Sequence, residues 1–250
     1  MAKHGPRNRF WEVDLVRGLA VILMITFHAL YDISFFGIQH FDLYSGLSGI
    51  FAYSIGTIFL LVVGVSLHLS YSAAKRKLDR RQLRNKFLLR GAKIFALGLI
   101  VTFATYLFIP ESFIVFGVLH CIGLSIVLSY PLLNKPNACL LLGALTVGMG
   151  VVLSDHLFDS PWLLWLGFRP IGFQTLDFFP LLPWFGVVLI GTFIGAWFYP
   201  NHQRRIFIRD RPRNIFSKTT CFLGRHSLVI YFLHQLILVA VIYALTGLDQ

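Results

Sequence analysis

Seven long apolar stretches, separated by short polar segments, constrain the fold of this chain more than any other feature. The hydrocarbon core of a bilayer is about 30 Å thick, and about 20 helical residues cross it. Since backbone groups in lipid must find hydrogen-bond partners within their own segment, stretches of this length are predicted to be helices. The stretches cover residues 13–36, 48–72, 91–109, 113–131, 138–154, 180–198 and 226–247.

We therefore expect an all-α fold, a polytopic transmembrane bundle of about seven spans in which residues 1–250 form a single integral-membrane domain. The composition agrees, because 56% of the residues are hydrophobic and only 13% are charged, which excludes an ordinary soluble domain. The first stretch contains Arg17 and no small-residue cleavage pattern follows it, so we expect a retained span rather than a signal peptide. The three cysteines are scattered and predict neither a disulfide framework nor a metal site.

The charge distribution orients the predicted bundle, because Lys and Arg are retained on the cytoplasmic side during insertion. With a cytoplasmic N-terminus, the outer loops hold mainly acids, namely Asp42, Glu111, Asp155, Asp159 and Asp177 against Arg169. The inner segments hold a basic loop at residues 75–86 together with Lys3, Arg7, Arg9, Lys135, Arg204, Arg205, Arg209, Arg211, Arg213 and Lys218. Topology thus explains most of the net charge of +11, and no nucleic-acid partner is predicted. The same loops can hold the phosphates of an anionic donor such as an acyl-coenzyme A.

Ionisable side chains inside the predicted spans mark the candidate site, because they are costly in hydrocarbon and usually face a bundle interior or a wet cavity. His28 lies about 12 Å from the outer end of the first span, and His120 about 10 Å from the outer start of the fourth. His234 lies about 12 Å from the inner start of the last span. Asp32 follows His28 by one helical turn, and a carboxylate there can fix the imidazole tautomer and strengthen a general base.

Structural roles stay open for each of these histidines. His28 can instead be a helix-packing residue bonded to a neighbouring carbonyl, and His120 and His234 can be polar fasteners between helices. Two other classes of function also stay open: a proton-coupled small-molecule transporter with a buried His and Asp relay, and a structural or lipid-organising membrane protein. A transporter is expected to carry internal repeats, and the two halves of the chain show no convincing repeat.

Five segments in order along almost the whole chain carry a resemblance to a known family. They read RFWEVDLVRGLAVILMITFHALYD in the first span, FLLVVGVSLHLS at 59–70, FIVFGVLHCIGLS at 113–125, DFFPLLPWFGVVLIG at 177–191 and SLVIYFLHQLIL at 227–238. Together they resemble the heparan-α-glucosaminide N-acetyltransferase catalytic-domain family. The first span and the YFLHQ segment are also similar to the broader membrane acyltransferase group that O-acetylates cell-surface sugars.

The resemblance implies a multi-pass acyltransferase of the cell membrane. Such an enzyme moves an acetyl or other acyl group from acetyl-CoA or another acyl-CoA to an amine or hydroxyl on the outer side. The implied partners are the lipid bilayer, the acyl-CoA and a glycan, amino-sugar or other envelope acceptor. A homo-oligomer is left open.

The same resemblance assigns residues one at a time. Asp14, Arg17 and Gly18 match the family's D-x-x-R-G pattern, and we predict that Asp14, Arg17 and Arg90 bind the acyl-CoA. The catalytic residues we predict are His28, Asp32, His120 and His234, of which His234 matches the family's terminal histidine.

The predicted substrate-binding residues lie in the outer loops. Asp177, Pro180, Pro183 and Trp184 match the family's D-x-x-P-x-x-P-W pattern, and we predict that Asp177 and Trp184 bind the acceptor. His40 is the nearest counterpart of a histidine in the family's first outer loop and is predicted to join them. The two prolines also predict that the sixth span begins with a bent or partly unwound turn, and Asp177 can alternatively cap a helix.

Overall fold

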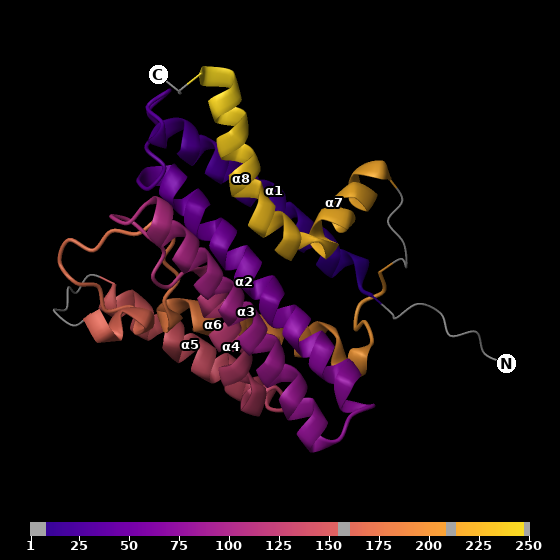
Figure 1. Cartoon of the computed structure of the whole chain (residues 1–250). Helices are drawn as coiled ribbons and strands as arrows, with labels where there is room; N and C mark the ends of the chain where they lie inside the picture. Colours follow the sequence, from indigo (N-terminus) through magenta and orange to yellow (C-terminus); the bar gives the residue numbers. More distant parts are fainter. Residues whose placement is uncertain (1–8, 155–160, 209–213, 248–250) are drawn as a thin grey trace. The chain divides into compact units, whose positions relative to one another are not determined.

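The computed structural model describes residues 9–154, 161–208 and 214–247. In these ranges the chain forms eight α-helices and three short 3₁₀ helices without a named strand (Figure 1), which confirms the all-α prediction. The α-helices are α1 Trp11–Phe35, α2 Gly46–Lys75, α3 Arg80–Phe108, α4 Val118–Ser129, α5 Pro136–Leu153, α6 Leu181–Phe198, α7 Ile215–Arg225 and α8 Ser227–Thr246. The 3₁₀ helices are η1 Tyr130–Leu132, η2 Pro161–Leu166 and η3 Pro200–His202. The predicted loop charges Lys3, Arg7, Asp155, Asp159, Arg209, Arg211 and Arg213 lie outside the described residues.

Six helices among the described residues, α1, α2, α3, α5, α6 and α8, are long and apolar enough to cross a membrane. The chain is therefore an integral membrane protein. The stretch at 113–131 differs from its prediction, because α4 has only 12 residues and reaches about 18 Å. Phe116 instead forms an isolated bridge with Phe178, and the residues directly before α4 are not helical. The count of seven spans and the cytoplasmic N-terminus stay predictions.

The first residues of α3 and α6 are determined by local features other than hydropathy: a side-chain cap in α3 and prolines in α6. α3 begins at Arg80, before its apolar stretch, because Asp79 and Gln82 form a reciprocal cap. The Gln82 N–H donates to Asp79 Oδ1 at 2.8 Å, which satisfies a free donor of the first turn. In α6, Leu182 has non-helical angles (φ −97°, ψ 120°), so the predicted bend at the start of this span is confirmed.

The first of two compact units contains the described residues up to Val62 and from Ile208 onward. In it α1 packs against α7 and α8. The α1–α7 contact is close because both helices place a glycine there. A Cβ on Gly18 would lie 1.9 Å from the Thr220 carbonyl oxygen, and a Cβ on Gly224 would lie 1.9 Å from the Asp14 carbonyl oxygen.

The second unit contains residues Val63–Phe207. In it α5 packs along α6, α3 packs along α4, and α4 also meets α6. Glycines again permit the close approach, since Gly123 faces the backbone of Gly91 and Gly186 faces that of Gly143. Backbones that approach at small residues are typical of helix pairs in membranes. The boundary between the units falls within α2, and the single domain over residues 1–250 stays a prediction.

We expect Gly18→Ala and Gly224→Ala each to lower the thermal stability of the detergent-purified protein. The added methyl group would meet backbone atoms of the partner helix, and overpacking of this kind destabilises proteins by about 1–3 kcal/mol. The matched control is Gly148→Ala in α5, where a Cβ would meet nothing within 4 Å. We expect this control to be neutral or slightly stabilising, because Ala is the better helix former. Equal melting temperatures for all three variants would contradict the α1–α7 contact.

Candidate functional site

Two of the predicted histidines lie together in the first unit. The rings of His28 on α1 and His234 on α8 have centroids 4.9 Å apart and meet edge to face at 79°. His234 is buried and His28 is half-buried. The predicted catalytic residues of the first and last spans are thus neighbours, although 206 positions separate them in the sequence (234 minus 28).

The backbone contacts of both rings fix their tautomers. His28 Nδ1 lies 2.8 Å from the Met24 carbonyl oxygen, and His234 Nδ1 lies 2.7 Å from the Tyr231 carbonyl oxygen. Because a carbonyl oxygen only accepts, each Nδ1 must carry the proton and donate it. In the neutral ring, Nε2 is then left with its lone pair, which is the form that a general base requires. Each ring thus makes, at Nδ1, the carbonyl contact expected of a helix-packing histidine. Its Nε2 keeps a lone pair that can accept a proton.

The predicted hydrogen bond from His28 to Asp32 is wrong. His28 bonds back to its own helix, and Asp32 Oδ1 instead accepts a hydrogen bond from Gln235 Nε2 of α8 at 2.7 Å. The reason is that a carbonyl oxygen of α1 lies one turn before His28, whereas an amide donor of α8 faces Asp32. Asp32 is 2% exposed, so the Gln235 amide compensates part of the loss of its hydration.

Three buried acceptor atoms of this cluster have no hydrogen-bond partner among the described residues. They are Asp32 Oδ2, Gln235 Oε1 and His234 Nε2. Buried polar atoms are nearly always paired in folded proteins, so each unpaired atom requires an explanation such as water, an ion or a substrate. All three unpaired atoms are acceptors, so a group that brings hydrogen-bond donors would complement them.

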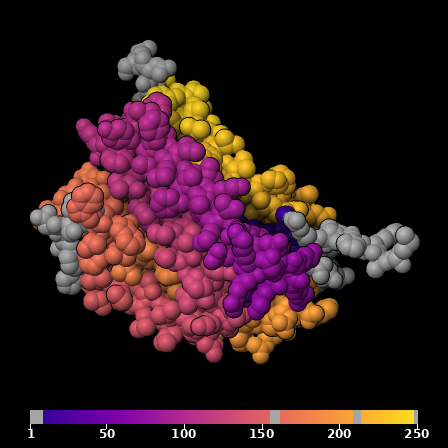
Figure 2. All heavy atoms as spheres, turned by 60° about the horizontal axis from the view of Figure 1, so that its bottom comes forward, coloured from indigo at the N-terminus to yellow at the C-terminus, as the bar shows by residue number. Residues whose placement is uncertain are grey.

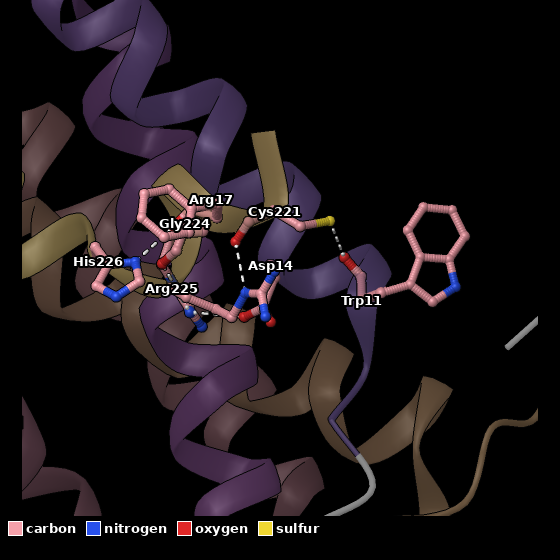
Figure 3. A network of polar contacts seen from close by, with 8 residues as sticks. Trp11, Asp14, Arg17, Cys221, Gly224, Arg225 and His226 are labelled. Carbon is pink, nitrogen blue, oxygen red and sulfur yellow. Dashed lines mark hydrogen bonds and ion pairs between the residues drawn. The ribbon is translucent and has the colours of Figure 1, made fainter. Parts of the chain in front are cut away.

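The predicted donor-binding residues Asp14 and Arg17 lie on α1 in contact with α7 (Figure 3). The Arg17 guanidinium donates to Asp14 Oδ1 at 3.1 Å and to the Gly224 carbonyl oxygen at 3.3 Å. The D-x-x-R-G pattern therefore has a structural explanation here. Its acid and arginine form an ion pair, and its glycine gives α7 room to bring the Gly224 carbonyl within reach. Arg90 lies on α3 in the second unit and is half-buried.

His120 belongs to the second unit and has the opposite tautomer. The Gly117 N–H donates to His120 Nδ1 at 3.3 Å, so in the neutral ring the proton lies on Nε2. Nε2 lies 3.5 Å from the Thr102 hydroxyl, and the ring packs between Phe95 and Phe116. Both nitrogens thus have protein neighbours, which favours the polar-fastener interpretation. The predicted pairing of His120 with His28 joins two units and stays a prediction.

Asp177 caps α4. Its Oδ2 accepts a hydrogen bond from the Val118 N–H at 2.9 Å, and the adjoining Phe179 N–H donates to the Phe116 carbonyl oxygen at 3.0 Å. This agrees with the capping alternative, although the capped helix is α4 rather than the predicted sixth span. Trp184 is 7% exposed and packs on Phe179 with centroids 4.8 Å apart.

His40 is exposed and lines a cavity of about 240 Å³ after the end of α1. Tyr31, Ser34 and Tyr44 share the lining, and Tyr31 directly precedes Asp32 in α1. The predicted acceptor residue thus lies at the same end of α1 as the His28–His234 pair. His28 and His234 do not line this cavity.

Sequence reasoning missed two functional candidates, Gln235 and Gly224. Gln235 follows His234 in the YFLHQ segment, and a polar amide inside an apolar stretch was the available signal. Gly224 lies in a loop segment that the charge pattern marked only as basic and cytoplasmic. No hydropathy signal distinguishes its helix, because α7 has only 11 residues.

A family model described as "Heparan-alpha-glucosaminide N-acetyltransferase, catalytic" matches residues 9–236. The matched range includes the whole of α1 and both His28 and His234, and it extends over most of the chain. No curated protein and no solved structure matches the chain.

We expect Asp177→Ala to lower the stability of the protein by about 1 kcal/mol, because an N-terminal helix donor loses its acceptor. Asp177→Asn is the matched variant, since its amide oxygen keeps the acceptor and removes only the charge. Thermal unfolding in detergent measures both. A capping role predicts that the Asn variant stays close to wild type, and an equal loss in both variants would contradict it.

We expect Cys221 to react slowly with N-ethylmaleimide at pH 7. Burial raises the pKa of the Cys221 thiol, its Sγ donates to the Trp11 carbonyl oxygen at 3.3 Å, and only the thiolate is strongly nucleophilic. The labelling rate should therefore increase about tenfold per pH unit above pH 7. Peptide mass spectrometry resolves Cys221 from the other cysteines, with protein unfolded in detergent as the fast-labelling control. Equal rates in folded and unfolded protein would be inconsistent with this environment.

Proposed function

The chain belongs to the heparan-alpha-glucosaminide N-acetyltransferase catalytic family, and we propose that it transfers an acyl group from acyl-CoA to an acceptor amine or hydroxyl. Membership of the family makes the chain a membrane acyltransferase-like protein with transferase activity. The acyl-CoA donor, the sugar or envelope acceptor on the outer side and the location in the cell membrane are parts of the proposal.

The observation that carries the proposal is the His28–His234 pair. Both rings donate from Nδ1 to a backbone carbonyl, and their centroids are 4.9 Å apart. Each ring is thereby held in the tautomer whose Nε2 is a base. General-base assistance of this kind contributes about 10²–10⁴-fold to a rate.

We assign the base role to His28. Its Nε2 removes the proton from the acceptor amine or hydroxyl while the nitrogen or oxygen attacks the thioester carbonyl carbon. The carbon–sulfur bond then breaks, and the coenzyme A thiolate leaves and takes the proton from the imidazolium. No co-reactant is needed, because the proton that His28 accepts is returned to the leaving thiolate.

A two-step route is the alternative within the same reaction class. An Nε2 lone pair attacks the thioester first, and the acyl-imidazole then passes its acyl group to the acceptor. Both routes use the same atom of the same residue, and a burst of coenzyme A release without acceptor would identify the two-step route.

The remaining catalytic predictions receive supporting roles in the proposal. His234 Nε2, Asp32 Oδ2 and Gln235 Oε1 are unpaired acceptors among the described residues, and we propose that they bind the donor hydrogens of the incoming acceptor. His120 is proposed as a positioning residue, because Gly117 and Thr102 occupy its two nitrogens. The assignments of His40, Asp177 and Trp184 to the acceptor stay predictions.

The donor is proposed to bind through its phosphates. Arg17 is fixed by Asp14 and the Gly224 carbonyl, and a guanidinium held in this way is preorganised for a phosphate. Arg90 is proposed as a second phosphate contact. Along α1, His28 lies 11 residues after Arg17, which is about 16 Å at the helical rise. This separation leaves room for an extended donor with its phosphates at one end and its thioester near the histidines.

We expect His28→Gln to reduce the rate of acetyl transfer from radiolabelled acetyl-CoA to glucosamine by about 10²–10⁴-fold. Binding of acetyl-CoA, measured by calorimetry in detergent, should be unchanged, because the phosphate contacts lie elsewhere on α1. His226→Gln is the matched control. His226 Nδ1 also lies 2.9 Å from a backbone carbonyl oxygen, that of Phe222, but its side chain is exposed.

Two results would reject the proposal. One is full transfer activity in a His28→Gln, His234→Gln double variant that is inserted normally. The other is an absence of saturable coenzyme A binding together with substrate-driven proton uptake in vesicles, which would favour the transporter.

A further inference from the structure

The helix α7 has a buried side that attaches it to α1 and an exposed side. Thr220, Cys221 and Gly224 form the buried side. The Thr220 carbonyl lies against Gly18, Cys221 Sγ donates to the Trp11 carbonyl, and Gly224 lies against Asp14. These contacts involve Trp11, Asp14 and Gly18, all in the first part of α1.

The exposed side of α7 is divided into an apolar strip and a basic edge. Ile215 and Phe222 are seven residues apart and therefore lie on one line of the helix, and Phe216 extends the strip. Ile215 is 79% exposed, Phe216 60% and Phe222 54%. Lys218 and Arg225, also seven residues apart, form the edge beside this strip and are exposed. Figure 2 draws all heavy atoms of the chain, with α7 and α8 in gold and yellow.

Two neighbours place α7 at the level where membrane spans end. On one side it contacts residues Trp11 to Gly18 of α1, the start of a candidate span. On the other side α8, another candidate span, begins at Ser227 immediately after α7. With 11 residues, α7 reaches about 16 Å and is too short to cross the hydrocarbon.

We propose that α7 is an interfacial helix that binds the surface of the bilayer and anionic phospholipids in it. Its strip of Ile215, Phe216 and Phe222 lies at the boundary of the acyl chains, and Lys218 and Arg225 contact lipid phosphates. An exposed apolar strip beside a basic edge is the pattern of helices that lie in the membrane interface. The lipid is the favoured occupant because the adjoining spans bring the bilayer to this level and the edge is positively charged.

The proposal is tested by the depth of labelled residues in vesicles of phosphatidylcholine with phosphatidylglycerol. A nitroxide is attached through p-acetylphenylalanine at residue 216, 222 or 218, which leaves the native thiols unmodified. Lys218 is exposed and lies on the basic edge rather than within the strip, so it is the matched control. We expect labels at 216 and 222 to be more accessible to oxygen than to a water-soluble nickel complex, and the label at 218 to lie closer to water. High nickel accessibility at both 216 and 222 would overturn the proposal, as would shielding from both reagents, which would indicate a protein contact.

A second measurement needs no label. Phosphatidylglycerol retained by the purified protein is compared between wild type, Lys218→Gln with Arg225→Gln, and Thr219→Gln as control. Each basic residue near an anionic surface contributes about 1 kcal/mol, so the double variant should bind the lipid about 25-fold more weakly. Unchanged retention in the double variant would refute the lipid contact. Neither readout depends on acyl transfer, so this inference and the proposed enzyme activity stand or fall separately.

Discussion

Hydrocarbon offers no hydrogen bonds, and this single property governs where the polar groups of α1 lie. A polar side chain in a span must find its partner in the protein, or leave an atom unpaired at a cost of about 1–3 kcal/mol. α1 meets this condition with two helices. At its start, Arg17 donates to Asp14 and to the Gly224 carbonyl of α7. Toward its end, Asp32 accepts from Gln235 of α8. The polar residues of one span thus determine which helices pack on it.

The need for a partner in the protein also draws attention to the polar atoms near the end of α1 that have none among the described residues. The Asp32–Gln235 bond uses one oxygen of the carboxylate and one N–H of the amide, and leaves one carboxylate oxygen and the amide oxygen as unpaired acceptors. His234 adds a third acceptor, because its Nδ1 is already bonded to the Tyr231 carbonyl. A purely structural helix contact has no need of three unpaired acceptors. They are consistent with the proposal that a substrate bearing hydrogen-bond donors enters here beside His28.

Hydropathy and positional spacing predicted the helical class, most helix positions and the bend at Pro180 and Pro183, because each depends on local sequence. They did not predict partners across the chain. The spacing of His28 and Asp32 by one turn made a hydrogen bond between them reasonable, yet the Met24 carbonyl and the Gln235 amide were better placed. Hydropathy likewise could not show that residues 113–117 are not helical, since an apolar loop and an apolar helix end can have the same composition. α7 was missed because its 11 residues, which include Lys218 and Arg225, form no apolar stretch long enough to predict a span.

His28, His120 and His234 were all predicted to be catalytic, but their tautomers differ because they occupy different positions in their helices. His28 and His234 lie inside helices, where the backbone groups within reach of Nδ1 are carbonyl oxygens of the preceding turn. His120 lies in the first turn of α4, where backbone N–H groups are still free, and the Gly117 N–H donates to it. An interior histidine therefore keeps its lone pair on Nε2, whereas a first-turn histidine keeps its proton there. Because helix boundaries decide the tautomer, a correct boundary for α4 would already have separated His120 from the candidate bases. It follows that the search for a general base in such a chain begins with histidines well inside a span.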